Sequence, residues 1–345
     1  MRHVGTLVAT AIALITSFAA TVAPTLACAG LIGSNGAVNL GRTTTLAAYH
    51  DGVEHYVTAF EFLGGGGQFG TLIPLPGIPS SVEKGGSWTL QRLALETAPR
   101  RRAFDAALEA APAASGVQVL LETRVDALDL TVLKGGARDV AAWAIDHGFS
   151  LSPDAPEVLD FYARRSPIFL AAVFDGDAAA ARGQRVGDGT PVQITIPTPN
   201  PWVPLRILGL GKQPSDRVDA DVFLLTDDRP ALLPVDGSTL RLEHDAVASQ
   251  QLLDDLRSDE RMEWVPTSAW LTKLRVDSRV SDLTYDLAVD ATGQGSPSRH
   301  AAGLDLAPRP APALLEGLMD APSLPLIFFA AAPAALAIWR RRGAR

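Results

Sequence analysis

The sequence predicts an α+β fold of mainly antiparallel β-hairpins and meanders with several packed helices, plus one C-terminal transmembrane helix. Three observations support this fold class. Short β-branched and apolar runs recur along the chain, and their connections are rich in Gly and Pro, as in antiparallel sheets. Segments of helical periodicity interrupt these runs. The chain closes on an uncharged stretch long enough to cross a bilayer.

Residues 1–29 have the three parts of a signal peptide: a basic start at Arg2, an apolar run, and an exit of small residues. Ala27, Cys28 and Ala29 match the small-x-small pattern of signal peptidase sites. We therefore expect cleavage after Ala29, with cleavage after Ala27 as the alternative. An uncleaved N-terminal anchor and a lipoprotein acylated at Cys28 stay open as two other interpretations.

Residues 321–339 carry no charge and are predicted to form a transmembrane helix. At about 1.5 Å per residue this segment spans roughly 28 Å, close to the hydrocarbon thickness of a bilayer. Arg340, Arg341 and Arg342 follow directly, and positive charges stay on the cytoplasmic side. This predicts a single-pass protein of the cytoplasmic membrane with membrane lipid as a partner, its body outside and its tail, residues 340–345, inside. A buried C-terminal helix of a soluble protein is the alternative.

The middle of the chain is predicted to hold an extracytoplasmic domain, residues 30–292, and a Gly-, Ser-, Pro- and Ala-rich linker, residues 293–320. Without Arg2 and the four C-terminal arginines, Lys plus Arg falls from 30 to 25 against 38 Asp plus Glu, so residues 30–320 carry 25 − 38 = −13. This charge opposes binding to nucleic acid. Cys28 is the one cysteine, which excludes an intramolecular disulfide, a thiol nucleophile and a cysteine zinc site in the domain.

The clearest local prediction is a β-hairpin over residues 43–62. Asp51 and Gly52 are the favoured pair for a type I′ turn, and this register places His50 opposite Val53 and Ala48 opposite His55. His50 and His55 then share one face, which makes them weak candidates for metal ligands. Because no third ligand lies near them, an ordinary pair of histidines is the preferred interpretation, and we predict no metal or other cofactor.

Further elements follow in order. Residues 71–79 contain three prolines and predict an edge or covering strand. Helices are predicted, the first capped by Ser87, at residues 87–99, 100–111, 137–147, 153–164 and 246–257. Strands are predicted at residues 117–132 (in two pieces), 168–174, 192–196, 203–210, 221–226, 269–276 and 283–289. The helical stretch near residues 135–165 suggests a division into two β-rich subdomains.

Several motifs are tested and set aside, so no catalytic residue is predicted. Residues 65–70 match GxGxxG, but prolines rather than a helix follow, which excludes a dinucleotide loop. Asp282, Asp286 and Asp290 alternate with apolar residues, which predicts acids on the wet face of a strand rather than a calcium site. Asp227 and Asp228 form the best carboxylate pair, but adjacent strand residues point to opposite faces. No GxSxG motif is present.

Several blocks of sequence carry a family resemblance. They are residues 43–62, the Phe-Gly-Thr-Leu-Ile-Pro-Leu-Pro-Gly-Ile-Pro block at 69–79, residues 88–93, the Tyr-Ala-Arg-Arg block that ends residues 155–165, and residues 168–169, 192–196 and 202–206. Over most of residues 30–290 the chain thereby resembles the bacterial family named domain of unknown function 2330. The resemblance implies exported, often membrane-attached proteins without an assigned activity, cofactor or catalytic residue.

Together these observations predict a membrane-anchored extracytoplasmic protein that binds or scaffolds an unidentified protein or ligand at the cell envelope and is not an enzyme. An envelope hydrolase or metal-assisted enzyme is one alternative, favoured by a deep pocket with at least three convergent polar groups. A small-molecule or ion sensor is the other, with the Pro-rich residues 72–79 or 196–204 lining its site. A flat face of clustered apolar residues would favour the binding role.

Overall fold

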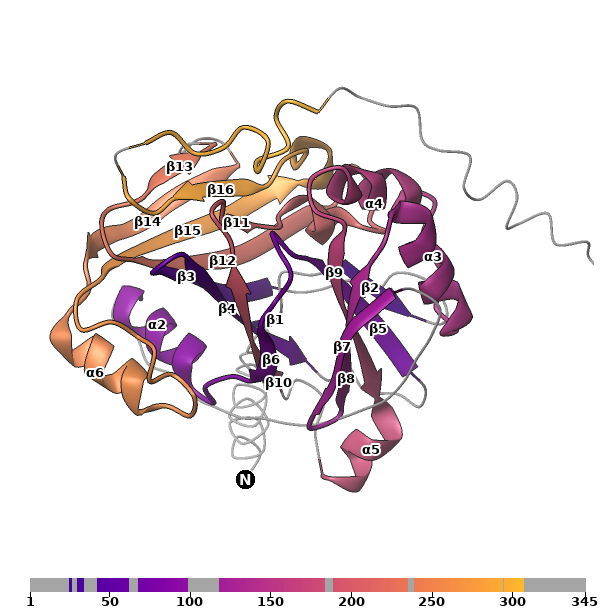
Figure 1. Ribbon diagram of the computed structural model, residues 1–345, viewed down its shortest axis with the longest axis horizontal. Helices are drawn as coiled ribbons and strands as arrows, with labels where there is room; N and C mark the ends of the chain where they lie inside the picture. Colours follow the sequence, from indigo (N-terminus) through magenta and orange to yellow (C-terminus); the bar gives the residue numbers. More distant parts are fainter. Residues whose placement is uncertain are drawn as a thin grey trace, which may run out of the picture.

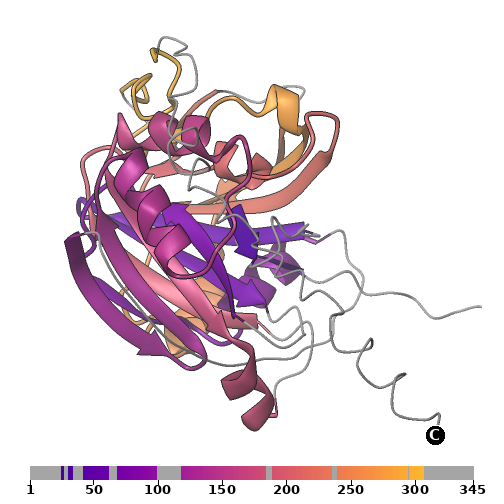
Figure 2. The same ribbon diagram turned by 90° about the vertical axis from the view of Figure 1, so that its right-hand side faces the viewer.

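The structure is a computed structural model that describes residues 25–26, 30–33, 42–61, 68–98, 118–183, 189–234, 239–293 and 295–306. In this part of the chain two large sheets and one small sheet combine with five α-helices (Figures 1 and 2). Most neighbouring strands run antiparallel. The predicted α+β class with mainly antiparallel strands is therefore confirmed.

The larger sheet has the order β14-β15-β12-β3-β4-β10-β6, with β1 paired beside β3. Two of its pairings are parallel, β12 with β3 and β1 with β3, and the others are antiparallel. Its strands are β1 (Thr25–Leu26), β3 (Arg42–His50), β4 (Val53–Glu61), β6 (Ser81–Lys84), β10 (Gly189–Pro197), β12 (Arg217–Thr226), β14 (Leu240–Val247) and β15 (Trp270–Arg279).

The second sheet is fully antiparallel, with the order β2-β5-β9-β8-β7. Its strands are β2 (Gly30–Gly33), β5 (Gln68–Pro74), β7 (Gln118–Val125), β8 (Leu128–Lys134) and β9 (Ile168–Asp175). A small third sheet has the order β11-β16-β13, formed by β11 (Trp202–Val203), β13 (Ala231–Leu233) and β16 (Leu287–Asp290).

The helices cover the outer faces of the two large sheets, which gives four layers (Figure 1). One apolar cluster contains buried residues from both sheets and forms the core between them. A second cluster joins the larger sheet to α2 (Thr89–Thr97) and α6 (Gln250–Ser258). A third joins the second sheet to α3 (Ala137–Asp146) and α4 (Ala155–Ala163), which occupy the helical stretch near residues 135–165. The short α5 (Gly176–Ala181) follows β9.

The predicted hairpin is confirmed in both its turn and its register. Asp51 and Gly52 have φ of 50° and 79°, as a type I′ turn requires. His50 pairs with Val53, and Ala48 pairs with His55. Local sequence sufficed here because the two turn residues fix the register of every pair that follows.

The prediction that Asp286 lies on a solvent-exposed strand face is wrong. Its side chain is fully buried in the structure. Its carboxylate accepts the main-chain N–H groups of Leu205 and Arg206 at 2.7 and 2.9 Å. This contact also explains why residues 203–210 do not form the predicted strand. The chain leaves β11 at Pro204, which has no N–H for a ladder, and turns into the 3₁₀ helix η1 (Arg206–Gly209).

Two other strand predictions are corrected. Residues 71–79 were expected at an edge, but β5 lies between β2 and β9, and its prolines begin only at its last residue, so its ladder is uninterrupted. The strand predicted at residues 283–289 is shortened to β16, because the 3₁₀ helix η2 (Val280–Asp282) and a turn precede it.

The folded body extends beyond the predicted boundary at residue 292. Ala301 and Ala302 are buried in the cluster beneath α4, and the main-chain N–H of Asp286 donates to the carbonyl of Ala302 at 3.0 Å. Residues 295–306 therefore pack on the body, although their Gly, Ser and Pro content is typical of a linker.

The capping of α2 depends on Asp259, which lies 172 residues after Ser87 in the sequence. Ser87 was expected to cap this helix, but no side chain within it does so. Instead the Asp259 carboxylate, just after α6, accepts the main-chain N–H groups of Ser87 and Trp88 at 3.0 Å and the Thr89 hydroxyl at 2.8 Å. This contact fixes α2 to α6 on the outer face of the larger sheet.

Several predictions fall outside the described residues. They concern the cleavage positions Ala27 and Ala29, the helix at 100–111, the span at 321–339 and the tail with Arg340, Arg341 and Arg342. Among the described residues, none of the helices has the length and apolar character needed to cross a bilayer.

Candidate functional site

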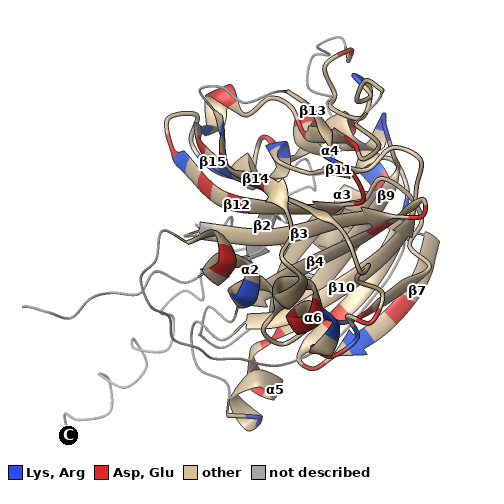
Figure 3. Ribbon diagram, turned by 90° about the vertical axis from the view of Figure 1, so that its left-hand side faces the viewer, with Lys and Arg blue, Asp and Glu red and all other residues tan. Residues whose placement is uncertain are grey.

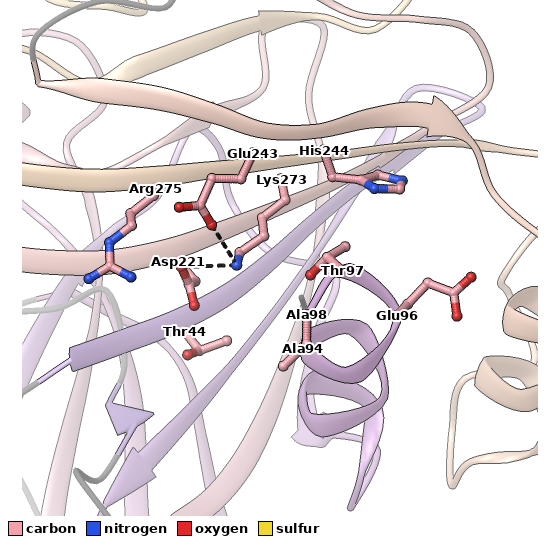
Figure 4. Close-up of a pocket in the computed structure, with 10 residues that line it drawn as sticks. All are labelled: Thr44, Ala94, Glu96, Thr97, Ala98, Asp221, Glu243, His244, Lys273 and Arg275. Atoms are coloured by element: carbon pink, nitrogen blue, oxygen red, sulfur yellow. Dashed lines mark ion pairs between the residues drawn. The ribbon is translucent and has the colours of Figure 1, made fainter. Parts of the chain in front are cut away.

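A pocket of about 880 Å³ opens on the outer face of the larger sheet, beside the C-terminal end of α2 (Figure 4). Strands β3, β12, β14 and β15 form its floor, and the last turn of α2 forms a wall. It is lined by Thr44, Ala94, Glu96, Thr97, Ala98, Asp221, Glu243, His244, Lys273 and Arg275.

Strand alternation divides the outer face of β12 and β15 into an apolar half and a charged half. Phe223, Leu225 and Leu271 lie in the apolar half, under α2 and α6. The charged half contains every second residue of β12 before Phe223 and of β15 after Leu271. These residues are Arg217, Asp219 and Asp221 on β12 and Lys273, Arg275 and Asp277 on β15. Because the helices cover only the apolar half, the charged half borders the pocket.

The charged residues of β12 and β15 pair diagonally across the two strands. Arg217 pairs with Asp277, Arg275 Nη2 lies 2.6 Å from Asp219 Oδ2, and Lys273 Nζ lies 3.6 Å from Asp221 Oδ1. The exposed fraction of the basic side chain falls along this series, from 63% at Arg217 through 24% at Arg275 to 8% at Lys273. Figure 3 shows the acidic and basic residues alternating along this edge of the sheet. The most desolvated pair therefore lies in the pocket.

A β-bulge in β14 adds a second carboxylate to Lys273. The register shifts between Leu242 and His244, and Glu243 occupies the bulge. Its carboxylate accepts Lys273 Nζ at 2.8 Å and Arg241 Nη2 at 2.8 Å. Burial by itself raises the pKa of Glu243, but the hydrogen bonds and charges of Lys273 and Arg241 outweigh it, and the pKa lies below its usual value. Lys273 thus lies between two carboxylates, as Figure 4 shows.

The wall of the pocket adds negative potential. It contains the C-terminal end of α2, which has no basic residue in its last turn to offset the helix dipole. Glu96 lies in the same turn, and its hydrogen bond from Arg92 lowers its pKa despite partial burial. The lining thus contains three carboxylates and two cations, and two of the carboxylates, those of Asp221 and Glu243, point toward Lys273, whereas Glu96 points away from it (Figure 4).

The predicted histidine pair does not converge on a common point. His50 Nδ1 lies 2.6 Å from Asp227 Oδ1, and its Nε2 lies 3.4 Å from Asp51. His55 instead stacks on Trp264, with 3.9 Å between ring centroids. Burial, and to a lesser extent the charge of His50, lowers the pKa of His55 to about 4, so this ring is neutral at pH 7. Within the described ranges no group of three or more His, Cys, Asp or Glu residues is arranged to hold a metal ion.

The comparison with family models identifies the family. Residues 22–248, about two thirds of the chain, match the model described as "Uncharacterized protein conserved in bacteria (DUF2330)". The chain belongs to the DUF2330 family. The resemblance found in the sequence is thereby confirmed. The matched residues include Thr44, Asp221, Glu243 and His244 of the pocket, whereas Lys273 and Arg275 follow them.

Other comparisons add no functional information about the DUF2330 chain. No curated protein matches it. Among solved structures, two of a mutated baculovirus P35 after caspase cleavage have TM-scores of 0.38 and 0.41 at 7% and 9% identity. They cover 72% and 74% of this chain and 99% and 98% of their own. The crystal structure of baculovirus P35 has a TM-score of 0.36 at 8% identity, covering 72% of this chain and 96% of its own. Similarity at this level says nothing about what the DUF2330 chain does.

Sequence reasoning missed the pocket residues Asp221, Glu243 and Lys273. One signal for them was present: Arg217, Asp219 and Asp221 alternate along one segment, and Lys273 and Arg275 alternate along another with complementary charge. That pattern predicts paired strands only when the register between segments about 50 residues apart is known. The bulge that turns Glu243 toward Lys273 leaves no mark in the local sequence.

Proposed function

We propose that this DUF2330 protein is an exported, membrane-attached binding protein whose pocket beside α2 receives a small molecule with a positively charged group. The observation that carries this proposal is the composition of the pocket. The lining has three carboxylates, Glu96, Asp221 and Glu243, against the two cations Lys273 and Arg275, and the C-terminal end of α2 adds the negative end of its dipole. A ligand ammonium group can be shared between carboxylates that already accept the ammonium of Lys273.

The surface of the described residues favours a small ligand over a large apolar partner. Its five exposed large apolar side chains are spread over four segments, and only Trp88 and Leu95 share one element, α2: Ile78, Trp88, Leu95, Ile145 and Val247. Docking of a protein through an apolar patch has no counterpart in this arrangement. The binding role is therefore assigned to the pocket.

A hydrolase is the second candidate, because Asp221, Glu243 and Lys273 are three polar groups that converge in one pocket. Their mutual ion pairs leave the ammonium and the Glu243 carboxylate engaged with each other, which disfavours a nucleophile or general base there. His50, His55 and Asp227 line no part of this pocket. The Pro-rich segments proposed for a sensor lie outside its lining as well.

The proposed localisation and membrane topology of the protein depend on the apolar segments near both termini and on Arg340, Arg341 and Arg342. We expect an alkaline phosphatase fusion after Pro312 to be active, because that position lies outside the cytoplasm. A fusion after Arg345 should be inactive, because the tail lies inside. Each fusion is scored in whole cells against its level on an immunoblot. The reverse pattern of activity would contradict the proposed topology.

The ligand proposal predicts that di- and polyamines bind while acidic or neutral small molecules do not. Titration of spermidine into the purified protein is expected to release heat and to raise the melting temperature by several degrees at millimolar concentration. Glutamate and glucose serve as anionic and neutral probes. Because the attraction is electrostatic, affinity should fall as salt rises.

The Thr97→Lys variant distinguishes an effect on ligand binding in this pocket from an effect on the stability of the fold. The added ammonium at the end of α2 repels a cationic ligand and should weaken spermidine binding at least tenfold. The same charge offsets the helix dipole, so the fold is expected to keep or gain a few tenths of a kcal/mol. Asp277→Asn removes a carboxylate from the exposed end of the charged strands and should leave binding unchanged. Equal spermidine affinity in all three proteins would refute the assignment.

A further inference from the structure

A second pocket, of about 400 Å³, lies between the small sheet and the larger sheet, where the edge strands β13 and β14 approach one another (Figure 1). It is lined by Arg229, Pro230, Ala231, Leu232, Leu242, Asp245, Thr272, Leu274 and Gly293. Because β13 pairs with β16 and β14 pairs with β15, side chains rather than a ladder connect the two walls. The volume lies within the roughly 300–1,000 Å³ that is typical of small-molecule sites.

Leucines from three strands form the apolar part of this pocket. Leu242 of β14 pairs with Leu274 of β15, so both lie on the inner face of the larger sheet, and Leu232 lies on β13. Leu274 is fully buried in the core between the two large sheets. Leu232 and Leu242 pack against that core but stay half-buried. A ligand that fills the pocket would therefore remove further leucine surface from water.

The polar part of the pocket contains an ion pair between Arg229 and Asp245. Asp245 Oδ2 accepts hydrogen bonds from Nε of Arg229, at 2.8 Å, and from its Nη2. Asp245 Oδ1 accepts the indole N–H of Trp270 at 2.6 Å. Burial by itself raises the pKa of Asp245, but the hydrogen bonds from Arg229 and Trp270 outweigh it, and the pKa lies below its usual value. Both oxygens of this ionised carboxylate are thus engaged.

Arg229 keeps donors that the protein does not use. Among the described residues none accepts a hydrogen bond from its Nη1, and its side chain is 65% exposed. Its backbone is held in place by Gly293, where an added Cβ would lie 2.1 Å from the carbonyl oxygen of Arg229. The polar part of the pocket therefore offers guanidinium N–H groups to a ligand, whereas its carboxylate is already satisfied.

We propose that this pocket binds a medium-chain carboxylic acid, with the carboxylate on Arg229 and the alkyl chain against the three leucines. A carboxylate accepts charge-assisted hydrogen bonds from a guanidinium. At roughly 30 Å³ per non-hydrogen atom, the share that a water molecule has in the liquid, the pocket holds about a dozen such atoms, which fits octanoate. The pocket beside α2 lies on the opposite face of the larger sheet and selects cations, so the two assignments stand independently.

The test is calorimetric titration of the full-length protein with octanoate at constant ionic strength. Affinity should rise about threefold to fourfold with each CH₂ group from butanoate to octanoate, as expected for burial of an alkyl chain. The neutral 1-octanol should bind at least tenfold more weakly than octanoate. Saturating spermidine should leave octanoate binding unchanged. Equal affinity for octanoate and 1-octanol, or for butanoate and octanoate, would overturn the proposal.

Arg229→Gln should weaken octanoate binding at least tenfold and leave 1-octanol binding unchanged. Arg217→Gln is the matched control, because Arg217 is 63% exposed and also pairs with one aspartate, Asp277. It should bind octanoate as the wild type does. If Arg229→Gln loses 1-octanol together with octanoate, Arg229 supports the shape of the pocket rather than a head group, and the proposal is overturned. Unchanged octanoate affinity in Arg229→Gln would overturn it as well.

Trp270 gives a spectroscopic signal from the same place, since its indole donates to Asp245. Octanoate should change the tryptophan emission of the wild type, and this change should be absent from Trp270→Phe. A full change in Trp270→Phe would place octanoate elsewhere and refute the assignment. So would the absence of binding by the wild type up to about 10 mM, roughly a hundredfold above a dissociation constant of about 0.1 mM.

Discussion

Asp286→Ala is expected to destabilise the body by about 3–5 kcal/mol, because it leaves a buried arginine without its counter-ion. The side chains of Arg165 and Asp286 are 1% and 0% exposed and form an ion pair. The Asp286 carboxylate also accepts the Tyr162 hydroxyl at 2.9 Å. The Arg165 guanidinium lies 4.2 Å from the centroid of Phe161 and 4.6 Å from that of Trp202. Water therefore cannot replace the lost carboxylate.

Urea unfolding followed by tryptophan fluorescence measures this effect. The neighbouring Arg164 provides a matched control, since its side chain is 21% exposed and pairs with Asp160 one helical turn away. Arg164→Ala should cost only about 0.5 kcal/mol, as expected for such a pair. Similar losses for Asp286→Ala and Arg164→Ala would contradict the structural role assigned to the buried pair of Arg165 and Asp286.

Glu54→Gln is expected to stabilise the protein by about 3 kcal/mol at pH 7. Glu54 lies on β4 with 1% exposure, on the same side of the strand as Tyr56 and Phe60 of the core between the sheets. Neither carboxyl oxygen has a hydrogen-bond partner. The main-chain N–H of Trp202 lies near enough to lower the pKa somewhat but falls short of hydrogen-bond geometry. Burial dominates and raises the pKa of Glu54 to about 8.

The direction of the pH dependence follows from this raised pKa. Below the ordinary value of 4.5 the carboxyl is protonated in both folded and unfolded chains, and burial of the charge costs nothing. Between pH 4.5 and 8 only the unfolded chain releases the proton, so the wild type loses about 1.4 kcal/mol per pH unit from this group. Above pH 8 the loss levels off. Glutamine stays neutral throughout, so its advantage should grow from pH 4.5 to pH 8.

Unfolding curves of the wild type and Glu54→Gln at several pH values between 4.5 and 8.5 measure this difference. Glu83→Gln, at an exposed glutamate on β6, is the matched control and should change stability by less than about 0.5 kcal/mol at every pH. A constant difference between Glu54→Gln and the wild type would contradict the raised pKa. A destabilised Glu54→Gln would show that the carboxyl has a stabilising partner.

Much of the fold was predictable from local sequence. The hairpin at Asp51 and Gly52 was predicted to the residue because a type I′ turn fixes its own register. Helices α3 and α4 were predicted within two residues by their apolar periodicity and by flanking Gly and Pro. The strand predicted at residues 203–210 failed because its backbone is held by the carboxylate of Asp286, about 80 residues away. The spacing of apolar residues within a segment cannot predict a contact with a residue so far away in the sequence.

The candidate sites were less accessible to prediction than the fold. His50 and His55 attracted attention as metal-type residues, yet each has its own partner, Asp227 and Trp264. Lys273 carries no local signal of a site, because its role depends on β14 and β12 flanking β15.

The amino-acid sequence by itself determined the α+β class, the DUF2330 family, the tight hairpin and the acidic character of residues 30–320. Each of these depends on composition or on neighbours a few residues apart. Only the tertiary structure decided which charges meet: Lys273 with Asp221 and Glu243, and Arg165 with Asp286. The physical reason is that strand order and register join segments tens of residues apart, and desolvation of a charge is decided by that assembly.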